Sequence, residues 1–105
     1  MMGFDTEPTG YIKTALSDLQ GAWTVLRESI VEHFGFPDSD KLLFHVDEAM
    51  SWESVRNLNK MKAALLLVQN IASQTDCPTE VREWVDDVRV SFDETQTAIA
   101  EGRAE

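Results

Sequence analysis

Apolar residues recur at alternating steps of four and three along two long stretches of this chain, and this spacing constrains the fold more than any other feature. The first line follows Pro8 and comprises Ile12, Leu16, Leu19, Trp23, Leu26 and Ile30. The second follows Pro78 and, apart from one threonine, is also apolar: Val81, Val85, Val88, Phe92, Thr95 and Ile99. Such steps keep side chains on one face of an α-helix, as in a near-heptad seam. Each stretch therefore predicts a long helix that buries one face.

The middle of the chain carries two shorter apolar stripes that do not line up. The first comprises Leu42, Leu43, Val46, Ala49 and Met50, and the second comprises Leu58, Met61, Leu65, Val68 and Ala72. At about 100° per residue, the second stripe is rotated by roughly a quarter turn from the first. This offset predicts a kink or a break near Ser51–Ser54, with one long bent helix as the alternative.

Helix-ending and helix-starting residues separate these stretches. Gly35 suits the position just after a helix, and Pro37 cannot continue one. Asp38 and Ser39 are typical N-cap residues for the next helix. Near residue 78 the sequence Asp-Cys-Pro ends the middle region, and Pro78 at the first helical position is expected to open the last helix.

These signals predict an all-α fold, a compact antiparallel bundle of three long or four helices, since short connections make neighbouring helices antiparallel. Alternating strand patterns and hairpin turns are absent from the sequence. A chain of 105 residues has room for one domain, so residues 1–105 are interpreted as a single helical domain with frayed ends at 1–7 and 103–105. The core of so small a domain is modest, which leaves homo-oligomer formation open as a way to enlarge it.

The strongly negative net charge limits which classes of partner the chain can bind. The chain has 19 acidic and 9 basic side chains and a net charge of −10, which repels phosphate backbones and anionic membranes. Direct nucleic-acid binding is therefore not expected. The longest unbroken apolar run, 63–68, is far shorter than the roughly 20 residues of a membrane span. The first residues do not resemble a signal peptide, and Cys77 is the single cysteine, so a cytoplasmic location is expected.

Signatures of catalysis are missing. The two histidines, His33 and His45, do not follow a glutamate by three positions, the spacing with which helical bundles present metal ligands. Cys77 has no second cysteine with which to bind zinc and is interpreted as a structural thiol. Phosphate-binding loops and nucleophile elbows are absent as well. We expect no enzymatic activity, no cofactor and no metal site.

A cluster of acids on the last helix offers a binding function instead. It comprises Glu83, Asp86, Asp87, Asp93 and Glu94. Small acidic inhibitors and immunity proteins use such faces to cover basic sites, gaining fast and salt-dependent association. Trp52, where the two middle stripes lose register, is a second candidate contact, and the alternative is that its ring fills the bend between the two helices. The sequence favours a non-enzymatic binding module for a basic protein partner, of inhibitor, immunity or counter-defence type, or a small subunit or adaptor. A merely solvated acidic face remains the simpler alternative.

One segment resembles a known family. Pro37-Asp38-Ser39, followed by Leu43, Val46, Asp47, Glu48, Ala49, Met50 and Trp52, is similar to the helical hairpin of phage-encoded cyclic-nucleotide sponges. Those proteins counter CBASS and Thoeris immunity by sequestering the signalling nucleotide. The resemblance covers about residues 37–52, and it departs from the family pattern in having Asp40, rather than a basic residue, directly after the turn serine.

The resemblance implies an alternative function, the sequestration of a cyclic nucleotide. Tyr11, near the start of the first helix, is similar to a family tyrosine, and Tyr11 or Trp52 would then stack on a base. Lys41, Arg56 and Lys60 would then contact the phosphates.

Overall fold

The computed structural model describes residues 8–55 and 57–103. They form four α-helices: α1 (Pro8–Glu32), α2 (Ser39–Ser54), α3 (Leu58–Gln74) and α4 (Thr79–Arg103). No strand occurs among these residues. The predicted all-α bundle is confirmed, in its four-helix form. The expected frayed segment 1–7 lies outside the described residues, as do 104–105, whereas the helix continues through Arg103.

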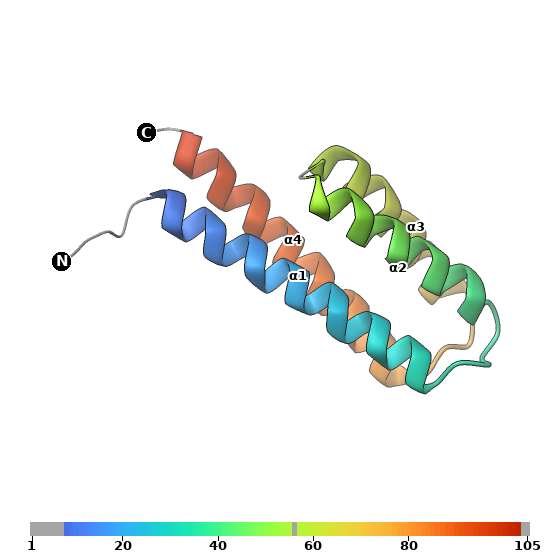
Figure 1. Ribbon diagram of the computed structural model, residues 1–105. Helices are drawn as coiled ribbons and strands as arrows, with labels where there is room; N and C mark the ends of the chain where they lie inside the picture. Colours follow the sequence, from blue (N-terminus) through green and yellow to red (C-terminus); the bar gives the residue numbers. More distant parts are fainter. Residues whose placement is uncertain (1–7, 56, 104–105) are drawn as a thin grey trace.

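The helices pack as two antiparallel pairs of unequal length. The long helices α1 and α4, of 25 residues each, lie side by side, and the shorter α2 and α3 form a hairpin beside them (Figure 1). The hairpin lies along the half of the long pair that holds the end of α1 and the start of α4. The other half of the long pair projects past it, which gives a molecule of 50 × 24 × 19 Å.

One continuous hydrophobic core joins the two pairs. Its largest fully buried side chains include Trp23 on α1 and Phe92 on α4, together with Val46 from α2 and Val68 from α3. Both predicted seams are buried wherever their side chains are described, except that Ile99 is only partly buried. The residues of the two middle stripes are also buried, except that Leu43, Met50 and Leu58 are only partly buried at the edge of the core.

The middle region is broken, which removes the alternative of one bent helix. α2 ends at Ser54 and α3 begins at Leu58, just beyond the predicted kink. Asn57 occupies the N-cap position of α3, and its side-chain oxygen accepts a hydrogen bond from the backbone N–H of Lys60 at 3.2 Å. An asparagine that satisfies one otherwise free N–H at a helix start fixes where the helix begins.

Two helix boundaries differ in detail from the expectation. Asp38 is the N-cap of α2, but its side chain makes no capping hydrogen bond because its backbone is left-handed, with φ of 64°. Ser39 instead accepts a hydrogen bond from the backbone N–H of Gly35 at 3.2 Å, which closes the turn after α1. α4 begins at Thr79, so Pro78 precedes the helix, and its carbonyl accepts from the Arg82 N–H at 3.2 Å.

Candidate functional site

The acidic residues predicted as a partner site all lie on α4, and all are exposed. Their side chains form what we call the α4 acidic face: Glu83, Asp86, Asp87, Asp93 and Glu94. Steps of four and seven place Glu83, Asp87 and Glu94 on one line along the helix, opposite the buried seam. Asp86 and Asp93 lie beside this line, toward α3. The helical phase read from the sequence therefore places these carboxylates in solvent together.

An apolar side chain stands within this acidic line. Val90 follows Asp87 by three residues and precedes Glu94 by four, and it is 45% exposed. Along the described part of α4, the same line continues through Thr97 to Glu101 and contains no lysine or arginine. Val90 is not among the residues predicted from the sequence, although the helical phase that exposes the acids exposes this valine as well.

The two arginines of α4 that are described with their side chains point away from this line. Arg89 pairs with Asp93 at 3.2 Å, an exposed i,i+4 pair that contributes little to stability. Arg82 donates to the Thr75 carbonyl oxygen at 3.1 Å. Arg82 also borders a shallow groove of about 380 Å³ between α3 and α4, together with Asp86 and Val85. The central carboxylates Glu83, Asp87 and Glu94 are left without a paired cation among the described side chains.

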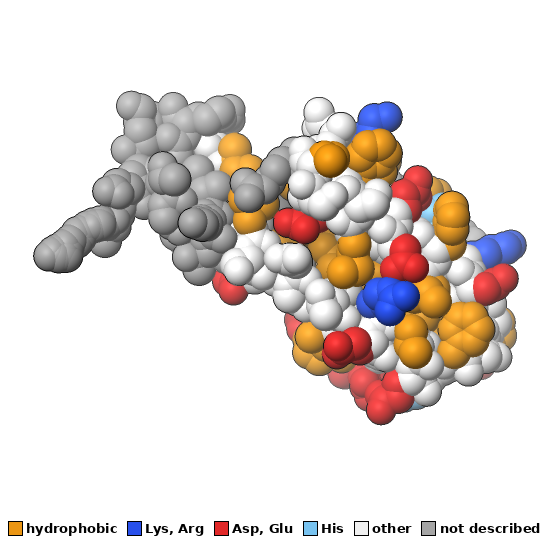
Figure 2. Space-filling view, in the orientation of Figure 1, with side chains coloured by type: hydrophobic (Ala, Val, Ile, Leu, Met, Phe, Trp, Pro, Cys, Tyr) orange, Lys and Arg blue, Asp and Glu red, His pale blue; other side chains and the backbone are white. Residues whose placement is uncertain are grey.

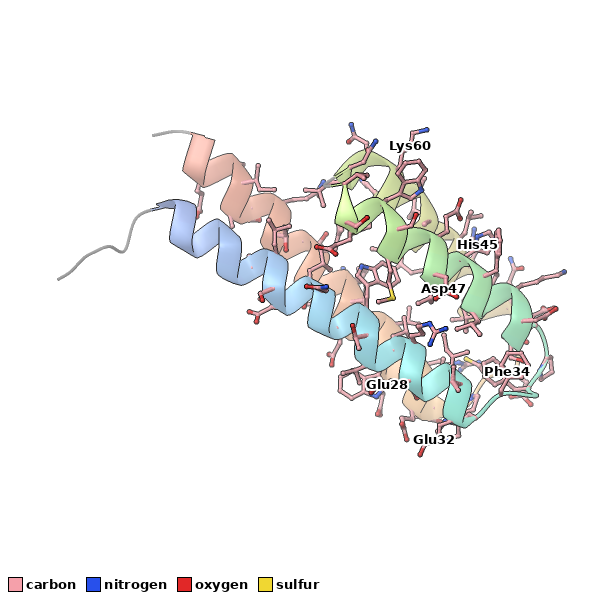
Figure 3. All side chains as sticks on the ribbon, viewed as in Figure 1. Glu28, Glu32, Phe34, His45, Asp47 and Lys60 are labelled. Carbon is pink, nitrogen blue, oxygen red and sulfur yellow. The ribbon has the colours of Figure 1, made fainter. Side chains whose placement is uncertain are left out.

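Further carboxylates lie where α1 meets the start of α4. A surface hollow of about 320 Å³ is lined by Val25, Glu28, Ser29, Glu32, Glu80 and Trp84. Glu28 and Glu32 are one turn apart on α1 (Figure 3), and Glu80 lies in the first turn of α4. None of these carboxylates is among the residues predicted from the sequence. The four-residue spacing of Glu28 and Glu32 was a visible signal, but only the pairing of α1 with α4 brings Glu80 beside them.

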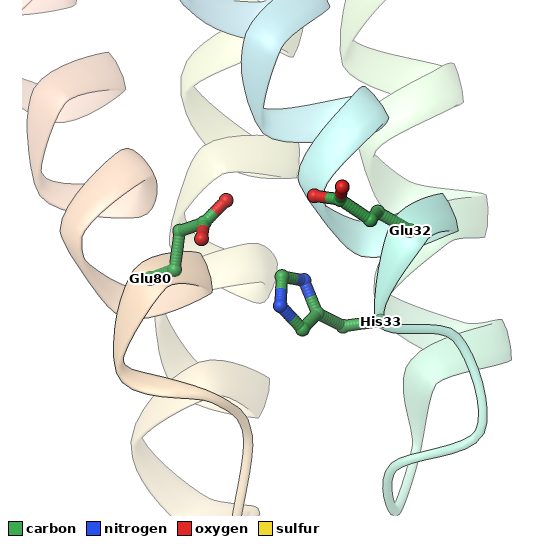
Figure 4. A group of neighbouring side chains, drawn as sticks. All are labelled: Glu32, His33 and Glu80. Atoms are coloured by element: carbon green, nitrogen blue, oxygen red, sulfur yellow. The ribbon is translucent and has the colours of Figure 1, made fainter.

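His33 joins this group. The side chains of Glu32, His33 and Glu80 converge between the two helix ends, and one donor atom of each lies within 4.8 Å of the others (Figure 4). This set does not follow the Glu-x-x-His spacing, because Glu32 directly precedes His33 and the third member, Glu80, lies on another helix. One imidazole and two carboxylates are donors that could hold a metal ion.

Trp52, the other predicted partner contact, lies apart from the α4 acidic face. It is half-buried near the end of α2 and packs against the core. The Lys60 Nζ lies 5.0 Å from the centre of its ring, in cation–π geometry. In the described chain α2 and α4 do not pack against each other. The structure therefore divides the predicted partner residues between two separate surfaces.

The residues implied by the resemblance are only partly brought together. Trp52 and Lys60 meet at the α2–α3 turn. Lys41 lies in the first turn of α2, 3.9 Å from the Asp38 carboxylate. Eleven residues of helix at 1.5 Å each place it about 16 Å from Trp52 along the axis. Arg56 and the side chain of Tyr11 lie outside the described residues.

Exposed apolar side chains also gather over the end of the molecule where α1 meets α2 (Figure 2). Val31 and Phe34 are 49% and 52% exposed. Val31 follows Arg27 by about one turn on α1, and Phe34 lies in the turn just after this helix. Arg27 pairs with Asp47 of α2 at 2.7 Å. Apolar side chains therefore dominate this surface, whereas carboxylates dominate the α4 acidic face.

None of the helices in the described segments is long and apolar enough to cross a membrane. No protein-family model, curated protein or solved structure matches the chain.

Proposed function

We propose that this protein is a non-enzymatic binding module whose α4 acidic face takes a basic segment of a protein partner. The observation that carries the proposal is Val90, exposed in the middle of a line of carboxylates that has no cation on it. Acids alone are common on soluble helices, and solvation explains them. A single exposed apolar side chain is also ordinary on a protein surface, so Val90 supports the proposal through its position at the centre of the acids, where an apolar residue of a partner can cover it.

The two kinds of side chain would do different work. The carboxylates raise the rate of encounter with a basic surface and orient it, because exposed charges act over the screening length of about 8–10 Å. Burial of Val90 then slows dissociation. The partner would carry lysine or arginine on both sides of an apolar residue. An inhibitor, immunity or counter-defence role in the cytoplasm fits this chemistry, as does an adaptor role.

Reversing two charges on the α4 acidic face should slow association about tenfold while leaving the fold intact. The variant is Asp87→Lys with Glu94→Lys, and the probe is a synthetic amphipathic helix that has lysines flanking a leucine stripe. Association is measured by stopped flow at low and physiological salt, and the native rate should fall steeply with salt.

The matched control places the same charge change on a helix that does not contact α4. Asp40→Lys with Glu53→Lys, both on α2, alters the net charge equally. This control should retain an association rate close to the native one. Equal slowing in both variants would mean that net charge alone attracts the peptide, and the α4 acidic face would lose its assigned role.

Sequestration of a cyclic nucleotide is the second candidate function. The observation that favours it is the Lys60–Trp52 pair, which combines a cation with an aromatic face at the α2–α3 turn. A pocket of about 470 Å³ lies next to this turn and is lined by Val55, Asn57, Leu58, Asn59 and Ile99. A base stacked on Trp52 would displace the Lys60 ammonium, which could then contact a phosphate.

A thermal-shift screen tests this second function. A cyclic di- or trinucleotide at a hundredfold excess over its dissociation constant should add about 2.7 kcal/mol of stability, which is several degrees. Lys60→Ala should remove the shift, whereas Lys41→Ala, at the other end of α2, should keep it. No shift at millimolar ligand, or an equal loss in both variants, would contradict a nucleotide site at this turn.

A further inference from the structure

We propose that Glu32, His33 and Glu80 form a site for one divalent transition-metal ion of the zinc class, which joins the end of α1 to the first turn of α4. The site lies beside the α4 acidic face and is independent of it. Its donor atoms, one imidazole nitrogen and two carboxylate oxygens, already lie within 4.8 Å of one another (Figure 4). Three protein ligands and a water would complete the tetrahedral coordination that zinc prefers.

A hydrogen bond to the backbone fixes the tautomer of His33 that can bind a metal ion. The Nδ1 of His33 lies 2.9 Å from the Ser29 carbonyl oxygen. A carbonyl oxygen can only accept, so Nδ1 carries the proton and the lone pair of the neutral ring is on Nε2. Ligating histidines are commonly held in this way, with the second ring nitrogen donating to a carbonyl or carboxylate. The hydrogen bond therefore selects the tautomer that binds a metal through Nε2.

The same serine also holds one of the carboxylates. The hydroxyl of Ser29 donates to Oε2 of Glu80 at 3.1 Å, and Ser29 itself is only 3% exposed. Because Ser29 belongs to α1 and Glu80 to α4, this bond crosses the helix pair at the proposed site. One buried residue thus orients two of the three ligands, the arrangement by which outer-shell groups keep metal ligands in place.

Nothing in the described part of the chain neutralises the two carboxylates. Neither Glu32 nor Glu80 forms an ion pair there with lysine or arginine. Both side chains are exposed, and both line the surface hollow of about 320 Å³, so an ion and its water have access. Ligands about 2.1 Å from a tetrahedral ion are about 3.4 Å apart. The donor atoms, which already lie within 4.8 Å of one another, therefore need to approach by at most about 1.4 Å when the ion binds.

The donor set also predicts which ions bind. An imidazole nitrogen favours Zn²⁺, Co²⁺ and Ni²⁺, whereas Mg²⁺ and Ca²⁺ prefer sites built of oxygen alone. Glu80 is far from Glu32 and His33 in the sequence and meets them only in the folded chain. Zinc should therefore stabilise the native state by mass action.

The test is titration of the intact chain with ZnCl₂, followed by calorimetry and by thermal unfolding, with MgCl₂ as the control ion. We expect one zinc per chain and a rise of several degrees in the melting temperature, with no rise in magnesium. His33→Gln should weaken zinc binding at least tenfold. Glu80→Gln should do the same, because its amide oxygen can still accept from Ser29 while the negative charge is lost.

The other histidine provides the matched control. His45 contacts Glu48 at 3.0 Å within α2, and His45→Gln should leave the zinc affinity and the stoichiometry unchanged. Three results would overturn the proposal: no zinc-induced shift, an equal shift in the His33→Gln and native chains, or a loss of binding in His45→Gln alone. Circular dichroism of each variant without zinc checks that the helices are intact.

Discussion

Replacing Leu19 or Leu65 with alanine is expected to lower the free energy of unfolding by about 2–5 kcal/mol. Leu19 is fully buried on α1, and Leu65 is 3% exposed on α3. Truncation removes the transfer free energy of the lost carbons and leaves a cavity that the close-packed helices fill only partly. Urea denaturation, monitored by circular dichroism and by tryptophan fluorescence, measures the change.

The two leucines also test whether the two helix pairs fold as one unit. Leu19 belongs to the α1–α4 pair and Leu65 to the α2–α3 hairpin, yet both belong to one core. Each variant should therefore shift a single cooperative transition seen by both probes. Asp18→Ala and Lys62→Ala, at neighbouring exposed positions, should change stability by less than about 0.5 kcal/mol. Two separate transitions in either leucine variant would show that the pairs unfold independently.

The long helices were predictable because apolar residues at alternating steps of four and three match the helical period of 3.6 residues and fall on one face only in a helix. Even Thr95, the polar member of the second seam, is fully buried as the phase requires. Its hydroxyl lies 2.8 Å from the Ser91 carbonyl oxygen and 3.2 Å from that of Ala15 on α1. A threonine can occupy a core position because the helix backbone satisfies its hydroxyl.

Pairing of the helices was not predictable in the same way. Helical phase shows which face of α1 is buried, but not whether α2 or α4 covers most of it. That choice depends on side chains of several helices packing at once. Ser29 illustrates the consequence, since only the α1–α4 contact explains why this polar residue is buried beside Glu80.

The candidate sites also differ in whether one helix or the packing of two helices determines them. Exposure of the α4 acidic face follows from the phase of one helix, and so does the exposure of Val90. The set of Glu32, His33 and Glu80 needs two helices, and no spacing within the sequence encodes it. Lys41 and Trp52 show the opposite case, because residues close in a motif can lie at opposite ends of a helix.

Substituting alanine for Gly21 and for Gly35 is expected to change stability in opposite directions. Gly21 lies exposed inside α1, where alanine should stabilise the protein by about 0.5–1 kcal/mol by restricting the unfolded chain. Gly35 has φ of 117°, a conformation that L-residues other than glycine rarely adopt, so alanine there should cost about 1–3 kcal/mol. Chemical denaturation of the two variants gives both values.

Steric clashes do not explain the difference between the two substitutions, because a Cβ atom added at either glycine meets nothing within 4 Å. The two substitutions add the same methyl group and differ only in the backbone that must accept it. D-alanine at position 35, introduced by chemical synthesis, prefers positive φ and should restore or exceed the native stability. A loss with D-alanine equal to that with L-alanine would mean that the methyl group itself is harmful. The turn from α1 to α2 would then owe its shape to close packing rather than to the freedom of glycine.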